Sequence, residues 1–108
     1  MEFLVEFEVH VPEEAPTSEV EVRQTAEAAA AARLVDEGHL VRLWRLVAGP
    51  GDTKALGLYR ADSDAQLADL LRALPLYEWM QVTVTPLEPH PNDPSRPATA
   101  AVTSASRP

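Results

Sequence analysis

The sequence predicts an α+β domain in which four strands and two helices follow the order strand, helix, strand, strand, helix, strand. Apolar and polar residues alternate along the N-terminal segment MEFLVEFEVHV, which is the period of a half-buried strand. Two capping-box patterns, beginning at Ser18 and Ser63, precede segments suited to helices. Two strand-like segments flank the turn signal AGPGD. This order is the ferredoxin-like βαββαβ pattern, an antiparallel four-stranded sheet with two helices on one face.

The first strand and helix have clear boundaries in the sequence. We expect the strand to run to Val11, because Pro12 ends it. The helix should begin at Ser18, with Thr17 as the rival cap, and end near Glu37. Gly38 then suits a left-handed exit from the helix. Five consecutive alanines within this helix favour close packing on a neighbouring element.

The second half of the domain follows from similar signals. We expect a hairpin of strands over 39–47 and 53–60, joined at residues 48–52. The helix after Ser63 carries leucines at the spacing of a buried face, and Pro75 ends it. An aromatic turn follows, and the last strand should span Met80–Leu87.

Composition limits the classes of function. A chain of 108 residues fits one domain, which we place at 1–92, followed by a flexible Pro/Ala/Ser/Thr-rich tail at 93–108. The net charge of −8 argues against a phosphate-backbone partner such as nucleic acid, because the sequence has no basic patch to release counterions. There is no cysteine for disulfide or thiolate chemistry. The charged, alternating N-terminus is neither a signal peptide nor a membrane span, so we expect a cytoplasmic protein.

The domain is small, and small domains often complete their cores by oligomerising. One face of a ferredoxin-like sheet carries no helix. Leu4, Leu40 and Trp44 are the candidates to cover that face in a dimer. We therefore expect a homo-oligomer.

Glu27 and Arg45 carry the main functional clue. On a helical wheel Glu27 lies on the same stripe as Val20, Ala31 and Leu34, which should face the core. In the following strand, Arg45 shares a face with aliphatic residues by the period of two. An inward acid near an inward arginine suits a catalytic pair, and a buried salt bridge is the purely structural alternative.

The polar face of the first strand offers a weaker clue. Glu6, Glu8 and His10 alternate there, so a metal site is conceivable. Ordinary alternation of a solvent-facing strand explains the same residues, and we expect no metal.

The chain resembles the muconolactone delta-isomerase family over roughly residues 1–92. Several short segments, in this order and spacing, carry the resemblance: Val11-Pro12, Glu27, Glu37-Gly38, Leu43-Trp44-Arg45, Leu74-Pro75-Leu76-Tyr77, Met80 and His90-Pro91. The resemblance implies a homo-oligomer, from dimer to decamer, with pockets at subunit boundaries. It also implies a cofactor-independent isomerisation in which a proton and a ring double bond move in a small lactone or enol.

The residues fit that implied chemistry. Proton transfer beside a lactone carbonyl needs a base whose pKa lies near the working pH, and an apolar setting raises the pKa of a carboxylate. Glu27 is the candidate general base, and Arg45 is the candidate donor to developing charge or to a substrate carboxylate. Four further residues are candidates for substrate binding: His39, Trp44, Tyr77 and His90.

One departure keeps other functions open. Family members typically carry a lysine directly after the glutamate of the first helix, and this chain has Ala28. The first alternative is a non-catalytic, oligomeric small-molecule-binding module, in which Glu27 is locked against Arg45 and leaves no room for a ligand. The second is a dimeric α/β-barrel monooxygenase-like enzyme, because that class shares the strand order.

Overall fold

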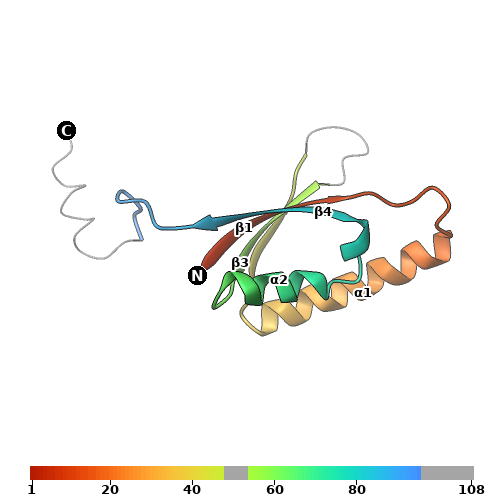
Figure 1. Ribbon diagram of the computed structural model, residues 1–108, viewed down its shortest axis with the longest axis horizontal. Coiled ribbons are helices and arrows are strands. Elements are labelled where there is room, and N and C mark those ends of the chain that lie inside the picture. The colour runs from red at the N-terminus through yellow and green to blue at the C-terminus, as the bar shows by residue number, and fades with distance from the viewer. Residues whose placement is uncertain (48–53, 96–108) are drawn as a thin grey trace.

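A computed structural model describes residues 1–47 and 54–95 and confirms the expected ferredoxin-like fold (Figure 1). The sheet is antiparallel, with the strand order β2-β3-β1-β4. Both helices lie on one side of the sheet (Figure 1). The elements are β1 (Glu2–Val9), α1 (Thr17–Asp36), β2 (Leu40–Arg45), β3 (Lys54–Arg60), α2 (Asp64–Arg72), the short 3₁₀ helix η1 (Tyr77–Trp79) and β4 (Met80–Leu87).

The core lies between the sheet and the helices, and β1 is its centre. Phe3, Val5 and Phe7 point to the helices and are almost completely buried, as the alternating pattern predicts. The strand ends at Val9, two residues earlier than expected. Val9 pairs with Met80, the first residue of β4, and beyond that pair the His10 N–H donates to the Trp79 carbonyl at 2.7 Å.

The two expected capping boxes have different outcomes. At α2 the prediction is confirmed, because the Ser63 hydroxyl accepts a hydrogen bond from the Gln66 N–H at 3.0 Å. At α1 it is wrong, because the helix begins at Thr17 with Pro16 as its N-cap and no side-chain cap. The Pro16 carbonyl accepts the first helical bonds there, from the N–H groups of Glu19 and Val20. The proline ring fixes the φ angle of Pro16, and the helix begins at the next residue, Thr17, one residue earlier than expected.

The exit from α1 is as expected. Gly38 has φ of 80°, in the left-handed region where glycine carries no steric cost. Its N–H donates to the Val35 carbonyl, and the next N–H, of His39, donates to the Leu34 carbonyl. These bonds satisfy carbonyls that the helix end leaves unpaired.

A bulge in β2 corrects the expectation for Leu40. Leu40 pairs with Tyr59 and Arg42 pairs with Leu58, so the register shifts between them. Leu40 therefore faces the helices in the core and does not lie on the open face. Trp44 pairs with Leu56 and lies on the open face, opposite in direction to Arg45, as expected. The AGPGD turn and residues 96–108 lie outside the described residues.

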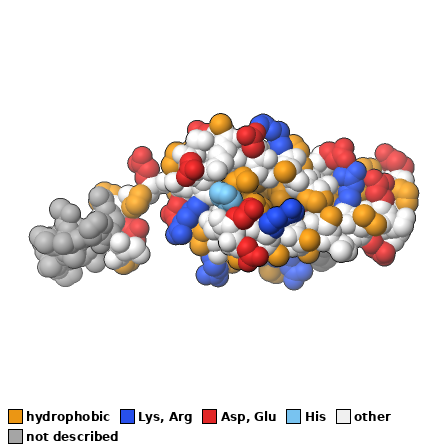
Figure 2. Space-filling view, turned by 90° about the horizontal axis from the view of Figure 1, so that it is seen from below, with side chains coloured by type: hydrophobic (Ala, Val, Ile, Leu, Met, Phe, Trp, Pro, Cys, Tyr) orange, Lys and Arg blue, Asp and Glu red, His pale blue; other side chains and the backbone are white. Residues whose placement is uncertain are grey.

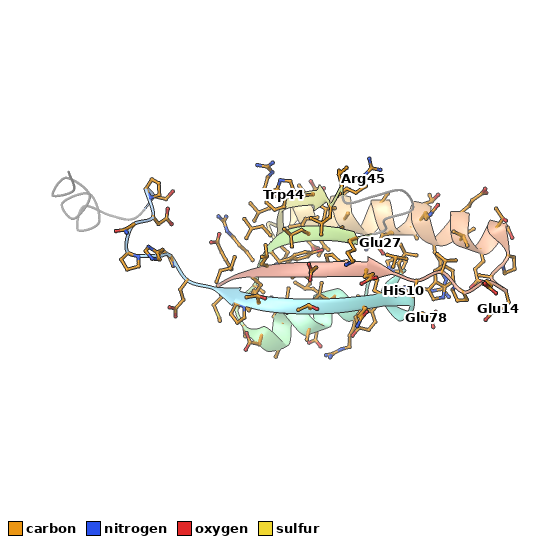
Figure 3. All side chains as sticks on the ribbon, turned by 90° about the horizontal axis from the view of Figure 1, so that it is seen from above. His10, Glu14, Glu27, Trp44, Arg45 and Glu78 are labelled. Carbon is orange, nitrogen blue, oxygen red and sulfur yellow. The ribbon has the colours of Figure 1, made fainter. Side chains whose placement is uncertain are left out.

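The two sides of the molecule differ. On the side that bears the helices, acidic and basic side chains are interspersed and do not gather by sign (Figure 2). The opposite side of the sheet carries no helix, and its strands are seen directly in Figure 3. Within residues 1–47 and 54–95, no helix is long and apolar enough to cross a membrane.

Candidate functional site

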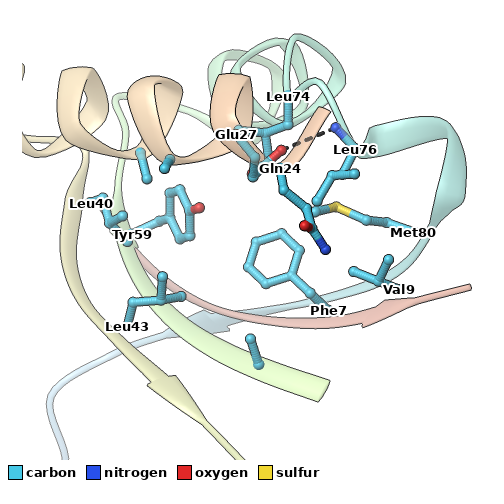
Figure 4. Close-up of a pocket in the computed structure, with 13 residues that line it drawn as sticks. Phe7, Val9, Gln24, Glu27, Leu40, Leu43, Tyr59, Leu74, Leu76 and Met80 are labelled. Atoms are coloured by element: carbon cyan, nitrogen blue, oxygen red, sulfur yellow. Dashed lines mark hydrogen bonds between the residues drawn. The ribbon is translucent and has the colours of Figure 1, made fainter. Parts of the chain in front are cut away.

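A pocket of about 340 Å³ lies between α1, the sheet and the turn that follows α2 (Figure 4). Its wall is mostly aliphatic and aromatic, with three residues that carry polar side-chain groups. The lining residues are Phe7, Val9, Gln24, Glu27, Ala28, Ala31, Leu40, Leu43, Ala55, Tyr59, Leu74, Leu76 and Met80. Ala28 and Ala31 of α1 line the pocket with methyl groups only, and larger side chains at these positions would fill part of its space.

Glu27 projects from the core-facing stripe of α1 into this pocket (Figure 4). One carboxylate oxygen, Oε1, accepts a hydrogen bond from the Leu76 N–H at 3.0 Å. Burial raises the pKa of Glu27 above its ordinary value of 4.5, and the Leu76 hydrogen bond opposes that rise. The result is a half-buried, fixed carboxyl group that is easier to protonate than a surface glutamate, which suits a general base.

Arg23 stabilises the segment that carries Leu76. Its Nη1 donates to the Pro75 carbonyl at 3.0 Å, and its Nη2 forms an ion pair with Glu78 at 2.6 Å. Its guanidinium lies 4.3 Å from the centre of the Trp79 ring. These contacts tie α1 to the turn after α2, and so hold the N–H group that orients Glu27. The spacing of four residues between Arg23 and Glu27 placed both on one helix face, which is a signal that our sequence reasoning did not use.

Tyr59 is a pocket residue that sequence reasoning missed. Its side chain is almost completely buried, and its hydroxyl points into the pocket (Figure 4). The ring packs at a tilt on Phe7, with 6.0 Å between ring centroids, and leans over Gly57. Burial, followed by the charge of Glu27, raises the pKa of Tyr59 to about 12. The phenol therefore stays protonated at working pH and can donate a hydrogen bond.

Arg45 does not lie beside Glu27. Its side chain is exposed, it is not among the lining residues, and no ion pair joins it to Glu27, although the structure describes both residues. By strand register it shares the helix-side face with Leu43 and pairs with Ala55, both of which line the pocket. The geometry thus excludes the buried salt bridge and leaves Arg45 near the end of β2 (Figure 3).

The four candidate substrate-binding residues also lie outside the pocket lining. Trp44 is on the open face, 4.9 Å from the Arg42 guanidinium. His39 Nδ1 is 2.8 Å from the Arg60 carbonyl, at the exit from α1. Tyr77 is exposed at the start of η1. His90 is exposed beyond β4 and accepts a hydrogen bond from the Asn92 N–H at 3.0 Å. No described contact of this chain brings these four residues to Glu27.

Fold and site together define a class: a small ferredoxin-like domain with a half-buried carboxyl group in an apolar pocket. Comparison with known proteins gives the family. The family described as muconolactone delta-isomerase matches residues 1–93. Muconolactone delta-isomerase 1 of Acinetobacter lwoffii is 32% identical over 85% of this chain and 93% of its own. The enzyme of Cupriavidus pinatubonensis is 33% identical over 85% and 97%. The chain belongs to the muconolactone delta-isomerase family, a family of lactone isomerases.

Solved structures agree with this assignment. A muconolactone isomerase crystal structure matches with a TM-score of 0.77 and 29% identity, over 90% of this chain and 95% of that one. A 5-chloro-2-hydroxyhydroquinone dehydrochlorinase from Burkholderia phenoliruptrix AC1100 matches with a TM-score of 0.59 and 19% identity, over 86% and 99%. The second likeness shows the shared fold alone.

Proposed function

We propose that this chain is a cofactor-independent isomerase of a small unsaturated lactone, muconolactone or a related compound, with Glu27 as the general base. The observation that carries the proposal is the position of Glu27, whose carboxyl group borders an apolar pocket and has a raised pKa. The activity of the curated relatives, named as muconolactone delta-isomerases, supports the same reaction class.

The proposed reaction needs one proton and no change of oxidation state. The Glu27 carboxylate takes a proton from the ring carbon next to the carbon–carbon double bond, on the side away from the carbonyl. The double bond is conjugated with the lactone carbonyl, and this makes the proton acidic. The electron pair of that C–H bond moves through the ring and places negative charge on the carbonyl oxygen. The proton returns to the carbon beside the carbonyl, and the double bond ends at its new position. A positioned base supplies about 10²–10⁴-fold in rate in such steps.

Arg45 retains its proposed role as a donor to a substrate, and His39, Trp44, Tyr77 and His90 retain theirs in binding. Because the described chain does not bring them to its own pocket, these roles require a neighbouring copy. A homo-oligomer with pockets completed at subunit boundaries is therefore part of this proposal. The non-catalytic alternative finds no support in the geometry, since it requires Glu27 locked against Arg45 without space for a ligand.

The test is a spectrophotometric assay of purified protein with muconolactone, run beside two variants. We expect Glu27→Gln to lose about 10²–10⁴-fold in kcat, because the amide cannot accept the proton. The matched control is Glu21→Gln on the exposed side of α1, which should keep the wild-type rate. Equal rates in wild type and Glu27→Gln would refute Glu27 as the base.

A further inference from the structure

The peptide group that joins Pro75 to Leu76 is held at both ends by side chains of α1. Its carbonyl oxygen accepts a hydrogen bond from Nη1 of Arg23 at 3.0 Å. Its N–H donates to Oε1 of Glu27, also at 3.0 Å (Figure 4). Within residues 1–47 and 54–95, no backbone group pairs with either end of it. One peptide group therefore connects the proposed base to an arginine four residues earlier on the same helix.

A peptide group can carry an effect from one of these side chains to the other. Its atoms lie in one plane, so fixing the carbonyl oxygen also fixes the direction of the N–H. Hydrogen bonds in a chain polarise one another, so a charged donor at the oxygen makes the N–H a stronger donor. Arg23 can thus affect both the direction and the strength of the hydrogen bond at Glu27, although it does not line the pocket.

Arg23 is itself fixed by the segment that follows this peptide group. Its Nη2 pairs with Glu78 at 2.6 Å and with Glu19 at 3.2 Å. The guanidinium lies 4.3 Å from the centre of the Trp79 ring, within the range of a cation–π contact. Glu78 and Trp79 both belong to η1. Because these contacts hold Nη2 and one face of the guanidinium, Nη1 stays directed at the Pro75 carbonyl.

Resting on the function proposed above, we propose that Arg23 is a positioning residue for the isomerisation, which acts through the Pro75–Leu76 peptide group to hold the Glu27 carboxylate in the orientation that takes the proton. Because the Leu76 N–H engages Oε1, Oε2 is the oxygen that receives the proton. The ion pair with Glu78 keeps Arg23 in place for this task. Arg23 makes no contact with the substrate, so its loss impairs the chemical step and not binding.

The titration of Glu27 reports on this connection. The Leu76 hydrogen bond lowers the pKa of Glu27 against the larger rise caused by burial, so a weaker bond raises that pKa further. Among the lining residues that the structure describes, Tyr59 of β3 is the other titratable group. Its pKa is raised to about 12, so it stays protonated while Glu27 titrates. A change in the Glu27 midpoint therefore does not come from ionisation of a second pocket group.

The test uses two readouts on the full chain: NMR titration of the Glu27 carboxyl carbon without substrate, and the pH profile of kcat/KM for muconolactone. Arg23→Met should move both midpoints to higher pH by about half a pH unit or more. It should lower kcat by about fivefold or more and change KM by less than about twofold. Arg23→Lys keeps the charge but lacks the planar fork, so it should resemble Arg23→Met. A loss of stability alone would move neither midpoint.

Glu78→Met tests the connection by the sign of its effect. Removing a negative charge acts directly to make Glu27 easier to ionise, which lowers its midpoint. Releasing Arg23 from its ion pair acts in the opposite direction, and we expect a net rise smaller than in Arg23→Met. The control is Arg33→Met, which removes an exposed arginine of α1 that takes no part in these contacts. It should keep both midpoints and the wild-type kcat.

The outcomes separate this proposal from the proposed reaction. Unchanged midpoints in Arg23→Met, wild-type behaviour in Arg23→Lys, or a lower midpoint in Glu78→Met overturns the role of Arg23. If turnover of muconolactone depends on Glu27 while these midpoints stay constant, the role of Arg23 falls and the isomerase function stands. If the NMR midpoints rise as expected and no lactone turns over, the connection from Arg23 to Glu27 stands and the isomerase function falls.

Discussion

Replacing Gly57 with alanine tests whether the ring of Tyr59 shapes the pocket. Gly57 is buried in the middle of β3, between Val5 of β1 and Leu43 of β2. A Cβ atom there would lie 2.7 Å from Cε1 of Tyr59, 3.2 Å from its Cδ1 and 3.4 Å from Cδ1 of Leu43. The first distance is too short for carbon atoms, so the Tyr59 ring must move into the space of the pocket.

The expected magnitude combines two opposing terms. Overpacking a tight core costs about 1–3 kcal/mol. Alanine in place of glycine restricts the unfolded chain and returns about 0.4–1 kcal/mol. The free energy of unfolding should therefore fall by about 1–2 kcal/mol. Displacement of the phenol should lower kcat/KM for the lactone by about tenfold or more, because misplacement by an ångström can cost about 100-fold.

The assay pairs urea unfolding with lactone turnover, and Gly38→Ala is the control. Gly38 has φ of 80° and no atom within 4 Å of an added Cβ, so its substitution strains the backbone at the exit from α1 without touching the pocket. We expect it to cost about 1 kcal/mol of stability and to leave turnover unchanged. If Gly57→Ala also leaves turnover unchanged, the reasoning about Tyr59 is refuted.

Three further predictions concern stability and charge. Burial raises the folded pKa of Glu27 above 4.5, so the stability linked to its protonated form is complete below pH 4.5 and is lost as the pH rises through the folded pKa. In urea unfolding, the stability of Glu27→Gln relative to wild type should therefore increase from pH 4 to pH 7. A difference that stays constant over this range would contradict the pKa shift. Arg45→Met should raise KM for muconolactone by about tenfold, because the proposed function has Arg45 of a neighbouring copy hold the substrate; an unchanged KM would remove that role. Leu67→Ala should cost about 2–5 kcal/mol in urea unfolding, because Leu67 is 1% exposed in the core; a loss below about 1 kcal/mol would show that the site repacks.

The parts of the fold that local periodicity encodes could be predicted from the sequence. The alternation in β1 and the leucine spacing in α2 each come from burial of one face, so they predict both the element and its inward side. The stripe of α1 placed Glu27 correctly for the same reason. The start of α1 could not be fixed, because Pro16, Thr17 and Ser18 are consecutive residues that all suit a helix start, and small differences in free energy decide among them.

Features that depend on contacts between distant segments were beyond the sequence. The β2 bulge changes the phase of the alternation and moves Leu40 into the core, and no residue at that point signals it. Tyr59 lies in a strand with aliphatic residues on both faces, so the period of two did not distinguish its inward direction. Arg45 was expected near Glu27 because both face inward, but a shared direction does not fix the distance between two elements.

The most direct test of the central claim is the pH dependence of kcat/KM for lactone isomerisation, measured from about pH 4 to pH 8. If the Glu27 carboxylate is the base, activity should rise with pH as that group ionises, with a midpoint above the ordinary value of 4.5, because burial raises its pKa. The Glu27→Gln variant should lack this rise and retain only residual activity. A wild-type rate without the acidic limb, or a Gln variant with the wild-type profile, would contradict the claim that Glu27 moves the proton.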